Sequence, residues 1–153
     1  MSRPDWNFIF VGPPDEQFRI CDLHQLLNVT FTGSKDVNEL PAYINSFDVC
    51  LNPQLLNEVT IGNYPRKIDE YLAMGKATVA TLTEAMEVFS EHVYLAQNKE
   101  EYLVLIEKAL REDSPEKQEQ RRSFASSHTW ENSVGQIYGA LENFGTGYII
   151  YDS

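Results

Sequence analysis

Strand-like and helix-like runs alternate along the whole chain, and this alternation constrains the fold more than any single motif. Short apolar runs that are typical of strands lie at residues 7–11, 29–32, 49–51, 77–80 and near 92–95. Stretches with apolar residues at helical spacing lie between them and after them. This order is typical of a parallel sheet that helices cover on both faces. We therefore predict an α/β fold with a Rossmann-like parallel sheet, in one domain that spans residues 1–153.

Apolar stripes predict where the helices lie and which face each one buries. One helix is expected from Asp15, and the other stripes indicate a short helix before residue 48, a helix over 65–74 and two helices in the last third of the chain. The stretch 114–127 is strongly charged, and it predicts a solvated helix or a linker. The stripe residues are Ile20, Leu23 and Leu27; Leu40, Tyr43, Ile44 and Phe47; Tyr102, Leu103, Ile106, Ala109 and Leu110; and Trp130, Val134, Ile137, Tyr138 and Leu141.

The charge balance excludes some classes of partner. The formal net charge of -11 argues against nucleic acid, because binding to a phosphate backbone depends mostly on Lys and Arg. No apolar run approaches the ~20 residues that a membrane-spanning helix needs, and the first residues do not form a signal peptide. Cys21 and Cys50 lie in apolar patterns that suit two reduced, buried thiols. We expect a cytoplasmic chain without a transmembrane segment, and a peripheral association with a membrane surface stays open.

Residues 52–81 carry the most chemical information. In open parallel sheets, ligands bind beyond the carboxyl ends of the strands, and this segment follows the third expected strand. Gly62 and Asn63 precede Pro65 at the start of a helix, where amides and the positive helix end can receive a diphosphate.

The helix that follows has one polar face. Arg66, Lys67 and Glu70 share this face, because they are three and four residues apart. Glu70 can accept hydrogen bonds from a diol, and Lys67 can offset phosphate charge. The alternative interpretation is an exposed, ion-paired helix face without a ligand. Gly75 is expected to end the helix in the left-handed conformation.

An ordered set of motifs resembles the donor-binding domain of GT-B glycosyltransferases of the family 4 type, the glycosyl transferases group 1. The first is the pattern PxKxxEYLAxGKxxVAT, which starts at Pro65, and two others are NVTFTG at residues 28–33 and FDVCLNP at 47–53. WNFIFVGP at 6–13 and HTWE at 128–131 also match, so the resemblance spans residues 5–142. It implies the C-terminal half of a GT-B fold from bacterial glycan biosynthesis.

The resemblance also implies roles for individual residues. It assigns the ribose hydroxyls of a nucleoside-diphosphate sugar to Glu70, the base to the backbone near Gly33, and the diphosphate to the amides of the turn at Gly62, Asn63 and Tyr64. Arg66 and Lys67 complete the expected donor site. No metal or other cofactor is expected, no catalytic residue is assigned, and an N-terminal acceptor-binding domain is expected outside this chain. Many relatives carry a second glutamate, but the corresponding position here is Gly62, so the sequence follows a Pro-x-Lys variant.

Two other interpretations compete with a glycosyltransferase domain. One is a noncatalytic Rossmann-like domain that binds a nucleotide or a protein partner. The other is a response-regulator-like signalling domain, which would need an acidic cluster after the first strand and an aspartate at the end of the third; Gly12-Pro13-Pro14 and Asn52-Pro53 stand there instead. His24, His92 and His128 lack metal-ligand spacing. Thr83 either borders the donor pocket or caps a helix.

Overall fold

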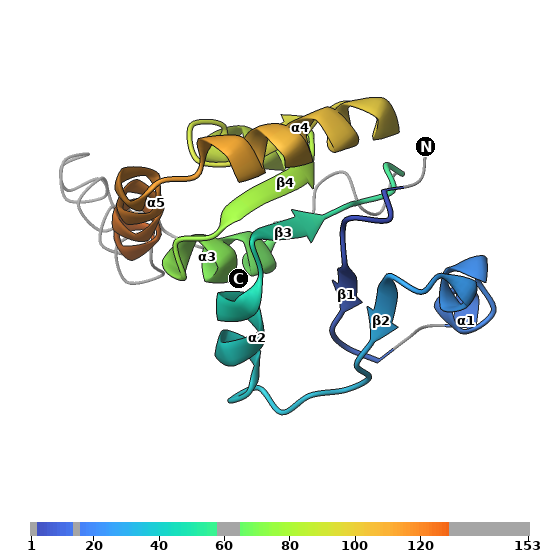
Figure 1. The fold of residues 1–153 in the computed structure, drawn as a ribbon. Coiled ribbons are helices and arrows are strands. Elements are labelled where there is room, and N and C mark those ends of the chain that lie inside the picture. The colour runs from blue at the N-terminus through green and yellow to red at the C-terminus, as the bar shows by residue number, and fades with distance from the viewer. Residues whose placement is uncertain (1–2, 14–15, 58–64, 129–153) are drawn as a thin grey trace, which may run out of the picture. The chain divides into compact units, whose positions relative to one another are not determined.

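A computed structural model of the chain describes residues 3–13, 16–57 and 65–128. Contacts within the chain divide it into two compact units, Met1–Ser46 and Phe47–Ser153. Both units contain parallel strands and helices (Figure 1), which confirms the predicted α/β class.

The first unit contains a two-stranded parallel sheet. Strand β1 (Phe8–Phe10) pairs with β2 (Val29–Phe31), with Phe8 opposite Val29. Both strands were predicted, and each is one or two residues shorter than expected. The rings of Phe10 and Phe31 stack with centroids 4.9 Å apart, so this pair packs across the two strands. Helix α2 (Leu40–Ser46) then follows, as the apolar stripe predicted, with Ile44 buried.

The expected helix over residues 15–27 is replaced by two short turns of helix. These are α1 (Glu16–Arg19) and the 3₁₀ helix η1 (Asp22–Gln25). The prediction of one amphipathic helix was wrong, because two of its three stripe residues, Ile20 and Leu27, are exposed. Cys21, at the start of η1, has the extended backbone of an N-cap residue, which interrupts a continuous helix. An apolar spacing alone does not give a helix when the unit offers no surface to bury it.

The second unit is built on a three-stranded parallel sheet with the order β3-β4-β5. Its strands are β3 (Val49–Asn52), β4 (Ala77–Thr81) and β5 (Tyr94–Ala96). Every residue of the central strand β4 is buried, because helix α3 covers one face and helix α4 covers the other (Figure 1). The sheet therefore has the two-sided cover that the sequence predicted.

Helix α3 (Arg66–Ala73) is shorter at both ends than the predicted 65–74. Pro65 stands at the N-cap position rather than inside the first turn. At the other end Gly75 has φ +73°, and its amide donates to the Leu72 carbonyl at 2.8 Å. The amide of Lys76 donates to the Tyr71 carbonyl at 2.9 Å, which completes a Schellman motif. The predicted left-handed cap at Gly75 is confirmed.

Two longer helices follow in the described part of the second unit. The helix predicted from the apolar stripe over 130–141 lies outside the described residues. Helix α4 (Lys99–Glu112) begins at Asn98, whose side chain accepts the amide of Glu101, and it buries Ile106 and Ala109. The charged stretch after it forms helix α5 (Pro115–Ser127), which settles the choice between a helix and a linker.

Helix α5 packs against α3 and encloses the main core. The 3₁₀ helix η2 (Glu84–Phe89) lies between β4 and β5 and contributes Met86 and Phe89 to this core, which Phe124 of α5 also contacts. The buried core residues are Ile68, Leu72, Ala80, Met86, Phe89 and Val93.

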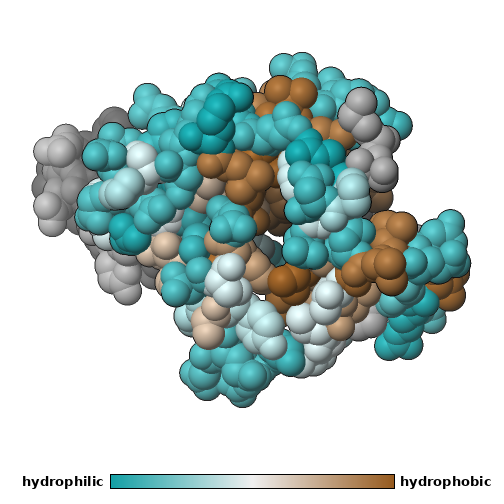
Figure 2. Space-filling view, in the orientation of Figure 1, coloured by the Kyte–Doolittle hydropathy of each residue, from teal (hydrophilic) through white to brown (hydrophobic). Residues whose placement is uncertain are grey.

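The visible face of the molecule is mostly hydrophilic, with scattered apolar areas (Figure 2), as expected for a chain of high net charge.

Candidate functional site

Helix α3 presents one buried face and one polar, exposed face. Ile68 and Leu72 are fully buried against the sheet, as the sequence predicted. The predicted ligand residues Arg66, Lys67 and Glu70 are all exposed on the other side of the helix. Among the described residues, no ion pair joins any two of these three side chains. The face is therefore exposed but is not held by internal ion pairs, which removes one part of the alternative interpretation.

No side-chain hydrogen bond from the N-cap residue caps the start of α3. Pro65 is the N-cap residue, its side chain makes no capping hydrogen bond, and its carbonyl accepts the amide of Ile68 at 2.9 Å. The predicted diphosphate turn at Gly62, Asn63 and Tyr64 lies outside the described residues. The proposed binding of a diphosphate at this turn therefore stays a prediction.

Gly33 lies in the first unit, directly beyond the carboxyl end of β2. It has φ +70°, a conformation that favours glycine, and its carbonyl accepts the amide of Gly12 at 3.1 Å. A Cβ added at either glycine would have no atom within 4 Å, so the backbone there is open on the side-chain side. The geometry allows a ligand to approach this backbone, and the role of Gly33 at a nucleotide base stays a prediction.

The carboxyl edge of the three-stranded sheet carries a cluster of neutral hydrogen-bonding groups. The amide of Gln54 donates to Thr81 Oγ1 at 2.9 Å, and Thr81 Oγ1 lies 2.8 Å from the hydroxyl of Tyr102. The Tyr102 hydroxyl donates to the carbonyl of Asn52 at 3.2 Å. This cluster joins the ends of β3 and β4 to α4, at the point where the chain leaves β3 toward α3.

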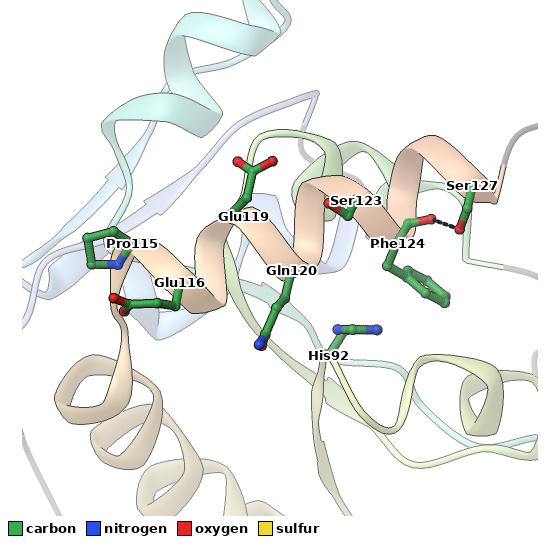
Figure 3. A pocket seen from close by; sticks show the side chains of 8 residues that line it. All are labelled: His92, Pro115, Glu116, Glu119, Gln120, Ser123, Phe124 and Ser127. Carbon is green, nitrogen blue, oxygen red and sulfur yellow. Dashed lines mark hydrogen bonds between the residues drawn. The ribbon is translucent and has the colours of Figure 1, made fainter.

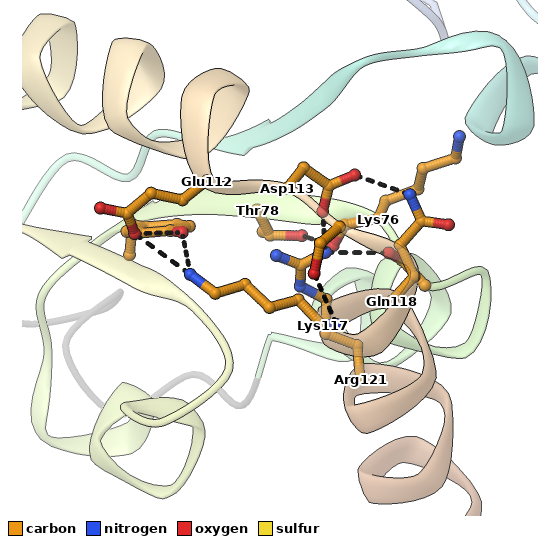
Figure 4. Close-up of polar contacts among 10 residues, drawn as sticks. Lys76, Thr78, Glu112, Asp113, Lys117, Gln118 and Arg121 are labelled. Carbon is orange, nitrogen blue, oxygen red and sulfur yellow. Dashed lines mark hydrogen bonds and ion pairs between the residues drawn. The ribbon is translucent and has the colours of Figure 1, made fainter.

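The amino edge of the same sheet carries charged groups that are paired with one another. Figure 4 shows Arg121 and Gln118 directed at Asp113, and Lys117 directed at Glu112. Arg121 is only 3% exposed, and it also donates to the carbonyl of Gly75 at 3.1 Å. This bond ties α5 to the end of α3.

Opposing effects set the pKa values of the two carboxyls at the amino edge. Burial alone would raise the pKa of Asp113, but hydrogen bonds from Arg121 and Gln118 outweigh it and leave the pKa below its usual value. The hydrogen bond from Lys117 lowers the pKa of Glu112. Both groups are therefore carboxylates at neutral pH.

Two hollows in the described part of the second unit lie beside α5, away from the predicted donor residues. The larger is an open depression of about 770 Å³ along α5, in which the ring of His92 faces that of Phe124 (Figure 3). The smaller, of about 290 Å³, is lined by Tyr94, Lys117 and their neighbours. Burial lowers the pKa of His92, so its ring is neutral at pH 7. Neither hollow is lined by Arg66, Lys67 or Glu70.

Comparison with known proteins assigns the chain to a family. The family model described as "Glycosyl transferases group 1" matches residues 1–112, which cover β1 through α4. The chain belongs to this glycosyltransferase family. The match includes α3 with its exposed polar face, and Tyr102 on α4, whereas α5 lies beyond the matched residues.

The chain is also similar to TuaH of Bacillus subtilis (strain 168), whose name assigns it to teichuronic acid biosynthesis as a glycosyltransferase. The two are 30% identical over 146 residues, which cover 90% of this chain and 36% of TuaH. The chain thus spans about a third of the length of this relative.

None of the described helices combines the length and the apolar character needed to cross a bilayer. Nowhere in the described ranges do three or more His, Cys, Asp or Glu residues come together in a way that could hold a metal ion. In the first unit His24 stacks on the ring of Phe31, whereas in the second unit His92 and His128 both contact the ring of Phe124.

The sequence did not single out the residues that organise the two edges. Tyr102 was interpreted only as one member of an apolar stripe, and Arg121 as part of a solvated surface. A hydroxyl in an otherwise apolar stripe was the available signal for Tyr102. For Arg121 the signal was weaker, because a helix with many charges does not show in advance which one is buried. Thr83 occupies the N-cap position of η2 without a side-chain capping bond, and its place at a donor pocket stays a prediction.

Proposed function

We propose that this chain is the nucleotide-sugar-binding domain of a GT-B glycosyltransferase. The observation that carries the proposal is the polar face of α3, which is exposed, lacks internal ion pairs and follows the carboxyl edge of a parallel sheet in a member of the group 1 glycosyltransferases. Carboxyl edges are where open parallel sheets bind ligands. The donor is a nucleoside-diphosphate sugar, and a separate domain of the longer protein binds the acceptor.

The proposed roles follow from the chemistry of each side chain. Glu70 accepts hydrogen bonds from two neighbouring ribose hydroxyls, as a carboxylate with two oxygens can. Lys67 and Arg66 lie one helical turn earlier, toward the positive end of α3, and offset the charge of the diphosphate. The backbone near Gly33 approaches the base. No metal takes part in this arrangement.

Transfer itself breaks the bond between the anomeric carbon and the diphosphate oxygen and forms a bond from that carbon to an acceptor hydroxyl, which loses its proton. The leaving diphosphate carries the charge that develops in this step. A site that orients the donor and stabilises that charge lowers the barrier without a nucleophile of its own.

We also propose a reducing, cytoplasmic setting for the chain. Cys50 is a buried thiol outside any disulfide, which suits a compartment where disulfides do not persist, whereas Cys21 is half-buried rather than buried as expected. Burial raises the pKa of Cys50 to about 12, so this thiol stays protonated and unreactive at neutral pH.

Glu70→Ala tests the proposed donor site. Titration of the chain with UDP, GDP and ADP by calorimetry should show binding of at least one diphosphate, and Glu70→Ala should weaken it by roughly 10- to 100-fold, since charge-assisted hydrogen bonds are lost. The melting temperature should stay within a degree or two, because the side chain is exposed.

The matched control is Glu100→Ala, which removes an exposed glutamate from α4. It should leave both the affinity and the melting temperature unchanged. If Glu70→Ala has no more effect on affinity than this control, then Glu70 is an ordinary surface residue. If the wild-type chain transfers sugar by itself, a separate acceptor domain is not needed.

A further inference from the structure

The hydrogen bonds at the carboxyl edge form a directed chain around Pro53. They begin at the amide of Gln54 and pass through Thr81 and Tyr102 to the carbonyl of Asn52. The first and last groups flank Pro53, which has no amide hydrogen of its own. Two hydroxyl side chains therefore satisfy the backbone groups on both sides of a proline at the end of β3.

The direction of each bond follows from the number of protons. A carbonyl oxygen only accepts hydrogen bonds, so the Tyr102 hydroxyl donates its one hydrogen to the carbonyl of Asn52. The Tyr102 oxygen must then accept from Thr81, and Thr81 Oγ1 accepts the amide of Gln54 in turn. All three hydrogens are used, and bonds ordered in this way polarise one another.

The two hydroxyl groups in this series of hydrogen bonds are largely buried and uncharged. Thr81 is 9% exposed, and Tyr102 is half-buried. Burial raises the pKa of Tyr102, so the phenol keeps its proton at neutral pH and the pattern does not titrate there. Loss of either hydroxyl removes a hydrogen bond from a backbone group beside Pro53.

This cluster lies at one end of the connection that leads to the donor helix. Residues 52–54 are where the chain leaves the sheet, and the other end of the connection is fixed by the buried Ile68 and Leu72 of α3. We infer that Tyr102 is a positioning residue for donor binding, which through Thr81 and Asn52 holds the start of the segment that leads to Lys67 and Glu70. The inference rests on the proposed function, and it adds a residue from α4 that does not touch the donor.

Tyr102→Phe is the direct test, because it removes one oxygen and keeps the ring. Affinity for the nucleoside diphosphate that the wild-type chain binds best should fall about 3- to 10-fold, as expected when ordering a loosened segment opposes binding. Tyr94→Phe is a matched control, because the Tyr94 hydroxyl bonds Glu112 at the opposite edge of the sheet. Calorimetric dissociation constants and melting temperatures are measured for both variants. Tyr94→Phe should leave the affinity unchanged, whatever its melting temperature.

A second pair of variants covers the case in which Tyr102→Phe does not fold. Thr81→Ser keeps the oxygen that links Gln54 to Tyr102, whereas Thr81→Val removes it at similar volume. Thr81→Ser should retain affinity and Thr81→Val should lose about as much as Tyr102→Phe.

The outcomes separate the two proposals. If the wild-type chain binds a diphosphate and Tyr102→Phe and Thr81→Val bind it equally well, the inference is overturned and the proposed function stands. Equal losses for Tyr94→Phe and Tyr102→Phe would also overturn it, since the effect would then be one of general stability. If the wild-type chain binds none of UDP, GDP or ADP, the proposed function fails, and the inference fails with it.

Discussion

The two edges of the β3-β4-β5 sheet use charge in opposite ways. At the amino edge Arg121, Asp113, Lys117 and Glu112 pair with one another. At the carboxyl edge the sheet is closed by neutral hydroxyls, and the charges of α3 that follow it stay exposed and unpaired among themselves. Charges that already have partners contribute to folding, whereas exposed charges beside a helix N-terminus can serve a ligand. We therefore assign a stabilising role to the amino edge and propose that the carboxyl edge serves donor binding.

The largest effect that would sharpen this comparison is expected from Arg121→Met. The change keeps much of the aliphatic stem but leaves Asp113 and the Gly75 carbonyl without their partner, so the free energy of unfolding should fall by about 3 kcal/mol. Urea denaturation measures the loss. Nucleotide affinity of the folded fraction should change little, because α5 does not carry the donor residues.

The neighbouring Arg122 provides the control. Its guanidinium is exposed and pairs with Glu119 at 3.2 Å, so Arg122→Met should change the free energy of unfolding by only about 0.5 kcal/mol or less. If both variants lost a similar free energy of unfolding, the burial of Arg121 would make no additional contribution to stability. If Arg121→Met lost as much nucleotide affinity as Glu70→Ala, the proposed division of roles between the two edges would be wrong.

A smaller effect is expected on the pH dependence of stability. The pKa of Asp113 is lower in the folded chain than in the unfolded chain, so its contribution is present above the unfolded pKa and is lost as the pH falls through the folded one. Below about pH 4 the wild type should progressively lose this contribution, because Asp113 becomes protonated. Asp113→Asn should be less stable at pH 7, and the gap should narrow toward pH 3. Urea denaturation between pH 7 and pH 3 measures the difference in the free energy of unfolding between the wild type and Asp113→Asn. A difference that does not change with pH would contradict the account.

The sequence predicted the second unit better than the first. The strands β3 and β4 are continuous apolar runs, and α3 combines a clear apolar stripe with Gly75 at its end, so local signals and packing agree. In the first unit Ile20 and Leu27 follow a helical spacing, yet both are exposed and the helix is broken. Apolar spacing predicts a helix only when another surface buries the stripe.

The candidate site also has one part that the sequence predicts and one part that it does not. The polar face of α3 follows from spacing along one helix, and the structure confirms it for Arg66, Lys67 and Glu70. The link from Thr81 to Tyr102 joins residues 21 apart on different elements. Such contacts depend on tertiary packing, which single-sequence patterns do not contain.

The central claim is tested most directly by Lys67→Met, measured with a nucleoside diphosphate and with the corresponding nucleoside at two ionic strengths. The aliphatic stem is kept, and the exposed ammonium near the start of α3 is lost. The account predicts that diphosphate affinity falls about 5- to 10-fold at low salt and by less at high salt, while nucleoside affinity and melting temperature stay unchanged. Equal losses for diphosphate and nucleoside, or no loss for either, would contradict a role of the α3 face in holding the diphosphate.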